Sequence, residues 1–371
     1  MEPYNPHDEP LEVTDFQPHP VELFDQQGRY VPTQMEYQYR FKKRRRLAII
    51  LFLATCLSVF FAGMNAGSGG PFELLDPSLW KEFPAELWKL WVFSGIKYAS
   101  SLMLILFAHE MGHYLQAKRY GVPASFPFFI PFPISPFGTM GAVIVQGAGV
   151  ADRKSMFDIA ISGPLAGLVF ALPIAWWGML NSSVEEVAAN GFRYGDPLIL
   201  QWMAEAVHGT IPKGADVTLN PLLFAGWVGI FITALNLIPI GQLDGGHILY
   251  TLIGKKAHYV AMGLMGGVVA LMILFNSWNY IVIVVLLYFM GPKHPPTADD
   301  TVPLGTTRII LGWVTLAFII IGFTPTPIIQ QEEEQKQEEK QIKTLPANEI
   351  VLTSQHKEYA SYHKIIKQQT N

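Results

Sequence analysis

The stretch from residue 90 to residue 116 reads LWVFSGIKYASSLMLILFAHEMGHYLQ, and it decides the class of fold. It is long and apolar enough to cross a bilayer as one helix, which takes about 20 residues. It nevertheless carries Lys97, His109, Glu110 and His113. Ionisable side chains at membrane depth are costly, so they mark a functional site. The stretch therefore predicts a membrane helix built around a polar centre.

The composition of the chain outside this stretch also indicates a membrane protein. Half of the residues are hydrophobic and only 15% are charged, where about 25% is usual in a soluble domain. The run Tyr259–Pro292 is too long for one crossing, so we expect two short spans separated at Asn276–Asn279, or one tilted helix with a re-entrant piece. The fold class is then an all-α polytopic membrane protein with about six to seven transmembrane helices. The other expected spans are Leu47–Phe72, Ile159–Leu180, Pro221–Ile253 and Ile309–Phe323.

The orientation in the membrane follows from the basic cluster Arg40–Arg46, which directly precedes the first span. Positive charge collects on the cytoplasmic side, so we expect the N-terminus in the cytoplasm. An apolar run begins at once after the cluster, which argues against a nucleic-acid partner. The polar N-terminus also shows no early apolar region typical of a cleaved signal peptide. We expect a multi-pass protein of a bacterial cytoplasmic membrane.

The chain divides into five expected regions. Polar, Pro-containing composition predicts a disordered cytoplasmic tail that ends in the basic cluster. The second, third and fourth expected spans, with the Pro-rich segment between the second and third, follow the first span. The regions are residues 1–46 (tail), 47–89 (first span and external loop), 90–255 (core), 256–329 (additional spans) and 330–371 (polar charged tail).

The segment Gly121–Gly149 differs from the spans on either side of it. Its five prolines exclude a continuous helix. Met140–Gln146 then reads as a strand. We therefore expect a small membrane-associated β-hairpin between the second and third spans.

The residues 109–113 spell H-E-x-x-H. On a helix, positions i and i+4 lie on one face, so the imidazoles of His109 and His113 can reach one ion. Catalytic zinc sites use three protein ligands and leave a position for water, whose pKa falls to about 7. Glu110 beside them is the candidate general base and acid. The alternative is a buried polar cluster that ties helices together.

A third ligand must come from elsewhere, and the sequence NLIPIGQLDGG at 236–246 supplies one in Asp244. Asp244 is the only acid in a long apolar stretch, and a metal held by two histidines would satisfy it. Pro239 and Gly241 would unwind the helix there. The alternatives for Asp244 are a pair with Lys255 or a helix cap.

Two more polar residues flank Asp244. His247, one turn later, is either a donor that orients the site or a plain helix residue. Asn236 could place an amide near the developing oxyanion, or could make an interhelical hydrogen bond.

These motifs resemble the site-2 protease family of intramembrane zinc metalloproteases. The resemblance rests on HEMGH at 109–113 and NLIPIGQLDGG at 236–246, and extends to GTMG at 138–141 and SGPLAG at 162–167. The Pro-rich loop and HPPT at 294–297 look most like the bacterial and plastid branch that lacks a PDZ domain.

The resemblance implies one Zn²⁺ per chain held by His109, His113 and Asp244, with Glu110 as general base and acid. It implies a membrane-anchored substrate with a transmembrane helix, often trimmed first by a site-1-type protease, and a role in regulated intramembrane proteolysis. The strand after Gly138, with Gly141 in it, would hold the substrate by strand addition, because a helical peptide bond must first be unwound.

Two other classes of function remain open. Broken helices and intramembrane charges also mark transporters or metal carriers, although the sequence shows no internal repeat and Glu110 suits hydrolysis better. A catalytically inactive relative that binds helices is the third class, and the presence of every expected catalytic residue speaks against it.

Overall fold

The computed structural model describes residues 23–24, 30–31, 34–65, 85–147, 149–186, 192–212, 214–274, 284, 291, 294 and 296–330. The expected break at Asn276–Asn279, the external loop at 66–84 and the tail from residue 331 lie outside the described residues.

Among the described residues, four helical stretches are long and apolar enough to cross a membrane. They are Arg44–Met64, Trp88–Arg119, Arg153–Leu180 and Asp244–Leu274. The first three lie in helices α1 (Gln34–Asn65), α2 (Ala85–Arg119) and α3 (Arg153–Leu180). The total of about six to seven spans stays a prediction.

The fourth expected span, Pro221–Ile253, is two helices rather than one. They are α5 (Pro221–Asn236) and α6 (Asp244–Ile253). The residues between them are not helical, as Pro239 and Gly241 predicted, and Gly241 has a φ of 59° that L side chains rarely adopt. A 3₁₀ turn, η3 (Gly254–Lys256), then leads into α7 (Ala257–Leu274).

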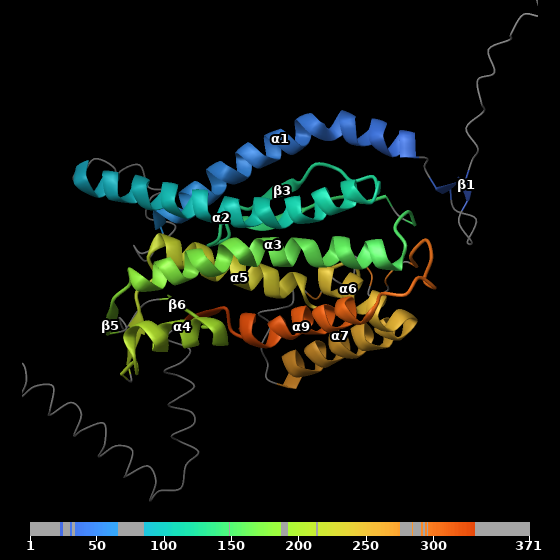
Figure 1. Cartoon of the computed structure of the whole chain (residues 1–371). Helices are drawn as coiled ribbons and strands as arrows, with labels where there is room; N and C mark the ends of the chain where they lie inside the picture. The colour runs from blue at the N-terminus through green and yellow to red at the C-terminus, as the bar shows by residue number, and fades with distance from the viewer. Residues whose placement is uncertain are drawn as a thin grey trace, which may run out of the picture.

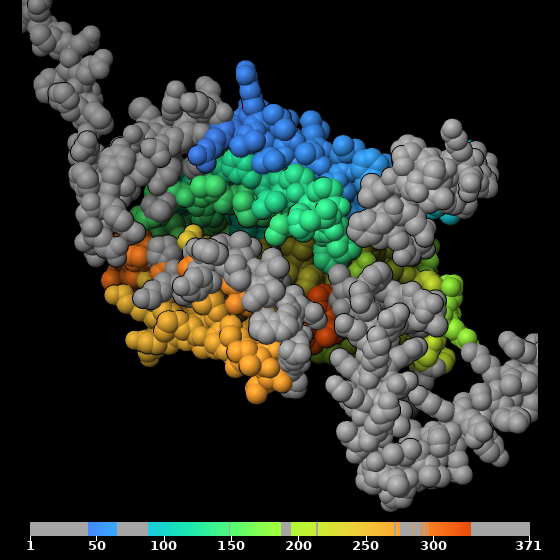
Figure 2. Space-filling view, turned by 180° about the vertical axis from the view of Figure 1, so that it is seen from behind, coloured from blue at the N-terminus to red at the C-terminus, as the bar shows by residue number. Residues whose placement is uncertain are grey.

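Helices α1, α2 and α3 lie side by side, and α5 packs against α2 and α3 (Figure 1). The core between them is aromatic: Trp227 and Tyr98 are fully buried, and the rings of Tyr98 and Phe224 stack with centroids 5.0 Å apart. Between membrane helices such side chains stabilise the fold through van der Waals packing and hydrogen bonds, since lipid is as apolar as the core. From the opposite side, α1 covers one edge of the molecule and α7 the other (Figure 2).

Helix α1 begins earlier than the sequence suggested. The disordered tail was expected to reach residue 46, but α1 starts at Gln34, and Leu23–Phe24 (β1) pairs with Tyr30–Val31 (β2). The expectation of disorder is wrong for these residues. Lys and Arg are good helix formers, so the basic cluster continues the membrane helix.

The hairpin expected in the Pro-rich segment is confirmed. Strand β3 (Phe128–Pro131) pairs antiparallel with β4 (Thr139–Val143), with a register irregularity between Phe129 and Pro131. The hydroxyl of Ser58 on α1 donates to the carbonyl oxygen of Gly138 at 2.6 Å. The hydroxyl of Tyr98 on α2 donates to the carbonyl oxygen of Phe137 at 3.0 Å. The hairpin is thus fastened to the first two helices.

The stretch between α3 and α5 has structure of its own. Strand β5 (Val184–Glu186) pairs with β7 (Ala215–Val217), and β6 (Phe192–Tyr194) pairs with β8 (Ile328–Gln330). Along the chain, the 11-residue helix α4 (Leu198–His208) lies between β6 and β7.

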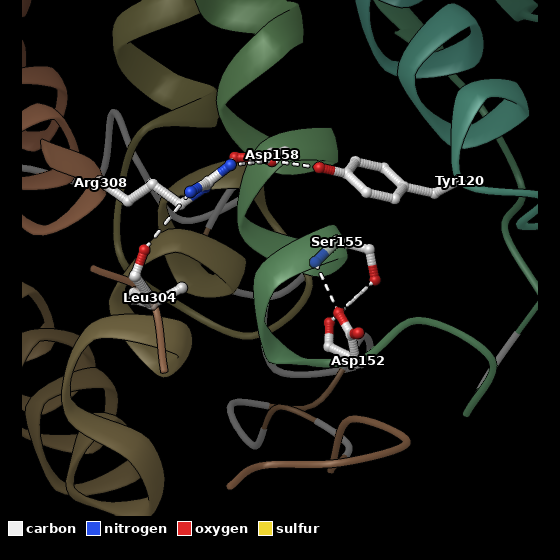
Figure 3. A network of polar contacts seen from close by, with 6 residues as sticks. All are labelled: Tyr120, Asp152, Ser155, Asp158, Leu304 and Arg308. Atoms are coloured by element: carbon white, nitrogen blue, oxygen red, sulfur yellow. Dashed lines mark hydrogen bonds and ion pairs between the residues drawn. The ribbon is translucent and has the colours of Figure 1, made fainter. Parts of the chain in front are cut away.

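Helix α9 (Thr306–Gly322) is held to α3 by an ion pair. The Arg308 guanidinium donates from Nε to Asp158 Oδ1 at 2.7 Å and from Nη2 to Oδ2 at 2.9 Å. The Tyr120 hydroxyl donates to the same carboxylate, and Figure 3 shows both groups converging on it. Nearby, Asp152 caps the N-terminus of α3 by accepting from the Ser155 amide at 2.7 Å.

Candidate metal centre

Helix α2 presents His109 and His113 one turn apart, with ring centroids 5.0 Å from each other. Both histidines and Glu110 are at most 5% exposed, although each carries a polar head that water would otherwise solvate. Burial of this kind requires that the groups satisfy one another or a bound ion.

Helix α6 brings Asp244 to the two histidines, and 135 positions of sequence separate it from His109. The Nε2 atom of His109 lies 3.1 Å from Asp244 Oδ2, and the Nε2 atom of His113 lies 3.2 Å from Oδ1. These three residues form a group whose ligand atoms all lie within 4.8 Å of one another. Asp244, the third ligand expected from the sequence, therefore lies close enough to both histidines to share one ion with them.

The contacts of Asp244 differ from both alternatives, a pair with Lys255 and a helix cap. Its carboxylate faces the histidines, and the N-cap position of α6 is Leu243, so Asp244 is the first helical residue rather than the cap. A carboxylate in the first turn is stabilised by the helix dipole. The close turn before it depends on Gly245 and Gly246, because a Cβ on either would collide with the carbonyl of Leu237 or of Gly241.

The tautomer of His113 suits a metal ligand. Its Nδ1 atom lies 2.8 Å from the carbonyl oxygen of Ile159 on α3. A carbonyl can only accept, so Nδ1 carries a proton, and in the neutral imidazole this leaves Nε2 as the atom that can bind an ion. Ligating histidines almost always donate their other N–H in this way. Two histidines and one carboxylate are a fitting donor set for zinc of the catalytic kind.

Helix α3 approaches the histidines closely because small residues line its contact face. A Cβ on Gly163 would collide with the imidazole ring of His113, and one on Gly167 would lie 3.1 Å from His109 Nδ1. On the α2 side, a Cβ on Gly112 would collide with the carbonyl oxygen of Ser162. Small residues four apart are the usual device for close helix approach in membranes.

Replacing Gly163 with alanine is expected to displace the His113 ring and to lower zinc affinity and any metal-dependent cleavage by at least about tenfold, since small misplacements near a reacting centre are expensive. Gly178→Ala on the same helix is the matched control, because its Cβ would collide with the backbone of Leu223 on α5, away from the histidines. Equal zinc affinity in the two variants would show that the glycine at 163 does not set the position of the ring.

The sequence singled out four further residues. Asn236 ends α5 and is half-buried, and its role in the chemistry stays a prediction. Gly138, with a φ of 77°, packs against the backbone of Ser58, so it serves the attachment of the hairpin. Gly141, with a φ of 97°, lies in β4, where a Cβ would meet only Ile232 at 3.9 Å. His247 hydrogen-bonds through Nδ1 to Nε2 of His294, so it is more than a plain helix residue.

The comparison with known sequences agrees with this geometry. Residues 97–275, which include both metal motifs, match peptidase family M50. These residues are an M50 peptidase domain. The resemblance to the site-2 protease family is thereby confirmed, and the M50 domain contains α2, α3, α5 and α6, which hold the three ligand candidates and Glu110.

Several plant proteins are similar to the chain across and beyond the M50 domain. A probable zinc metalloprotease EGY1, chloroplastic, from Oryza sativa subsp. japonica is 31% identical over 303 residues, which cover 75% of this chain and 50% of the relative. The protein of that name from Arabidopsis thaliana is 29% identical, covering 75% and 53%. A probable zinc metalloprotease EGY2, chloroplastic, from Arabidopsis thaliana is 30% identical, covering 63% and 42%.

The chain therefore spans about half the length of these curated relatives. Their names describe them as chloroplastic, which fits the resemblance to the bacterial and plastid branch of the family. They give no support to the bacterial cytoplasmic membrane that we expected from the sequence, so the M50 domain is placed in a membrane without a named compartment.

The sequence did not reveal the roles of Gly163, Gly167, the Ile159 carbonyl and His294 at the M50 centre. The signal for the glycines was present as SGPLAG at 162–167, whose small residues sit four positions apart. No signal could have found the Ile159 carbonyl, because every residue carries one.

Proposed function

We propose that this protein is a zinc-dependent endopeptidase that hydrolyses a peptide bond within or near a transmembrane helix of a membrane-anchored protein, in regulated intramembrane proteolysis. The observation that carries the proposal is the convergence of His109, His113 and Asp244, beside Glu110, within apolar helices. One zinc per chain would fill this group.

When bound, zinc polarises a carbonyl oxygen and makes water a better nucleophile at neutral pH. The chain itself supplies the proton transfers. The Glu110 carboxylate takes a proton from the attacking water, whose oxygen forms a bond to the scissile carbonyl carbon. Glu110 then gives that proton to the amide nitrogen as the carbon–nitrogen bond breaks. Exclusion of bulk water by the helices strengthens these electrostatic interactions.

The hairpin offers a way to present the substrate. Among the described strands, β4 pairs with β3 on one edge, and Met140 and Val143 of β4 are each 49% exposed. An extended peptide could add to the other edge through backbone hydrogen bonds. The proposal is that the substrate helix unwinds onto β4 after a first cut by a site-1-type protease.

The first test is cleavage of a model single-span substrate by the purified full chain in detergent, with and without a zinc chelator. We expect one zinc per chain, cleavage by the untreated protein and none after chelation, with activity restored by added Zn²⁺. Stoichiometric zinc without cleavage of any of several helical substrates would refute the protease and favour a metal carrier or an inactive helix-binding relative.

A further inference from the structure

Helix α6 holds Asp244 but cannot set its own position. It has only 10 residues, begins directly after the non-helical segment at 237–243, and ends at Gly254, whose φ is 65°. The histidines, in contrast, sit on the 35-residue helix α2. Because a metal ligand must be placed to within a fraction of an ångström, something outside α6 has to hold this short helix in register with α2.

A short segment, His294 together with residues 296–300, contacts α6 from outside. We name it the strap. The side chain of His294 is 5% exposed. It hydrogen-bonds to His247, and its ring stacks on Tyr250 with centroids 4.3 Å apart and planes 18° from parallel. His258 on α7 donates from Nε2 to the carbonyl oxygen of His294 at 3.1 Å.

The other end of the strap is fixed by Asp300. Its carboxylate accepts from the Tyr250 hydroxyl at 2.9 Å and from the Thr297 hydroxyl at 2.6 Å. Tyr250 is therefore held twice, through its ring by His294 and through its hydroxyl by Asp300. Any shift of Tyr250 would break its stacking with His294 or its hydrogen bond to Asp300, and losing such a contact costs free energy.

Arg153, the first residue of α3, joins the strap to the C-terminal end of α6. Its Nε donates to the carbonyl oxygen of Thr251 at 2.6 Å and its Nη2 to that of Leu252 at 3.2 Å. These are carbonyls of the last turn of α6, which favour a cation. The Arg153 amide also donates to the Asp299 carbonyl at 3.1 Å, and the Ala298 amide to the Ala151 carbonyl at 2.8 Å. Helix α3, which carries the Ile159 carbonyl bound to His113, is thereby linked to the strap.

We propose that the strap positions Asp244 for the metal, with His294 as its principal positioning residue acting through His247 and Tyr250. The inference rests on the metal centre of the proposed function. It concerns metal affinity and the order of α6, and does not depend on whether the protein cleaves a substrate.

The test compares His294→Ala with wild type in the full-length protein. We expect about 10- to 100-fold weaker zinc binding, the range typical of residues that orient ligands, and an altered absorption spectrum of the cobalt-substituted protein. Without metal, the amides of residues 244–253 should exchange hydrogen at least about tenfold faster. Asp300→Asn keeps the shape of the strap and should give the same changes at smaller size, which covers the case in which His294→Ala does not fold.

Arg308→Ala is the matched control, since it breaks an ion pair between α9 and α3 without touching the strap residues that hold α6. It should lower thermal stability while leaving zinc affinity, the cobalt spectrum and exchange at 244–253 as in wild type. Unchanged exchange and unchanged zinc affinity in both strap variants, or equal changes in Arg308→Ala, would overturn the proposal. If the wild type bound no zinc, the proposed metal centre would fail, and exchange at 244–253 would still decide whether the strap holds α6.

Discussion

Glu110→Gln is expected to reduce cleavage of a membrane substrate by roughly 10²- to 10⁴-fold, the share that general acid–base catalysis usually contributes. The amide has nearly the shape of the carboxylate but cannot take a proton from water. Glu110 is not among the three residues whose ligand atoms converge, so the variant should keep its zinc. The measurement is turnover of the model substrate together with zinc content by atomic absorption.

This variant separates the classes of function that the sequence left open. A carrier would keep metal transport with glutamine at 110, and an inactive helix binder would keep its binding. Cleavage at the wild-type rate in Glu110→Gln would show either that another group is the base or that the activity belongs to a contaminant. Glu110→Asp adds a second comparison, since it retains a base but shortens its reach, and should retain partial activity.

The second large effect is expected from Asp244→Ala, which removes the ligand supplied by α6. Zinc affinity should fall by more than the roughly 100-fold typical of residues outside the ligand set, and cleavage should fall with it. The two histidines of α2 would then remain with an incomplete set, because catalytic zinc sites use three protein ligands. Zinc competition with a chromogenic chelator gives the affinity.

Asp158→Asn is the matched control for Asp244→Ala. Asp158 is another carboxylate on an apolar helix, but its partners are Arg308 and Tyr120 rather than the histidines. It should lower stability and leave zinc affinity as in wild type. Full zinc occupancy at wild-type affinity in Asp244→Ala would show that the third ligand comes from another residue.

Local sequence was sufficient for those features that a single helix or turn decides. The spacing of His109 and His113 places both on one face of whatever helix contains them, because the helical repeat is local. Pro239 and Gly241 predicted a break because each acts on its own backbone. Five prolines between Gly121 and Gly149 excluded a helix there, and a hairpin is found.

Local composition gave a wrong prediction where the adjacent residues of the chain decide the secondary structure. Polar composition suggested disorder up to residue 46, but the helix of the first span extends back to Gln34. Once a helix has been nucleated by an apolar run, adding residues at its end costs little, so α1 continues into the basic cluster.

Tertiary structure alone determined how the centre is assembled. Asp244 reaches His109 across 135 positions only because α6 is separate from α5 and is packed against α3. The carbonyl of Ile159 orients His113, and His294 holds the helix that carries Asp244, through contacts that leave no local pattern. Sequence periodicity reports the faces of a helix, since it repeats along one axis. It does not report which faces meet, because that depends on how several helices share the same buried space.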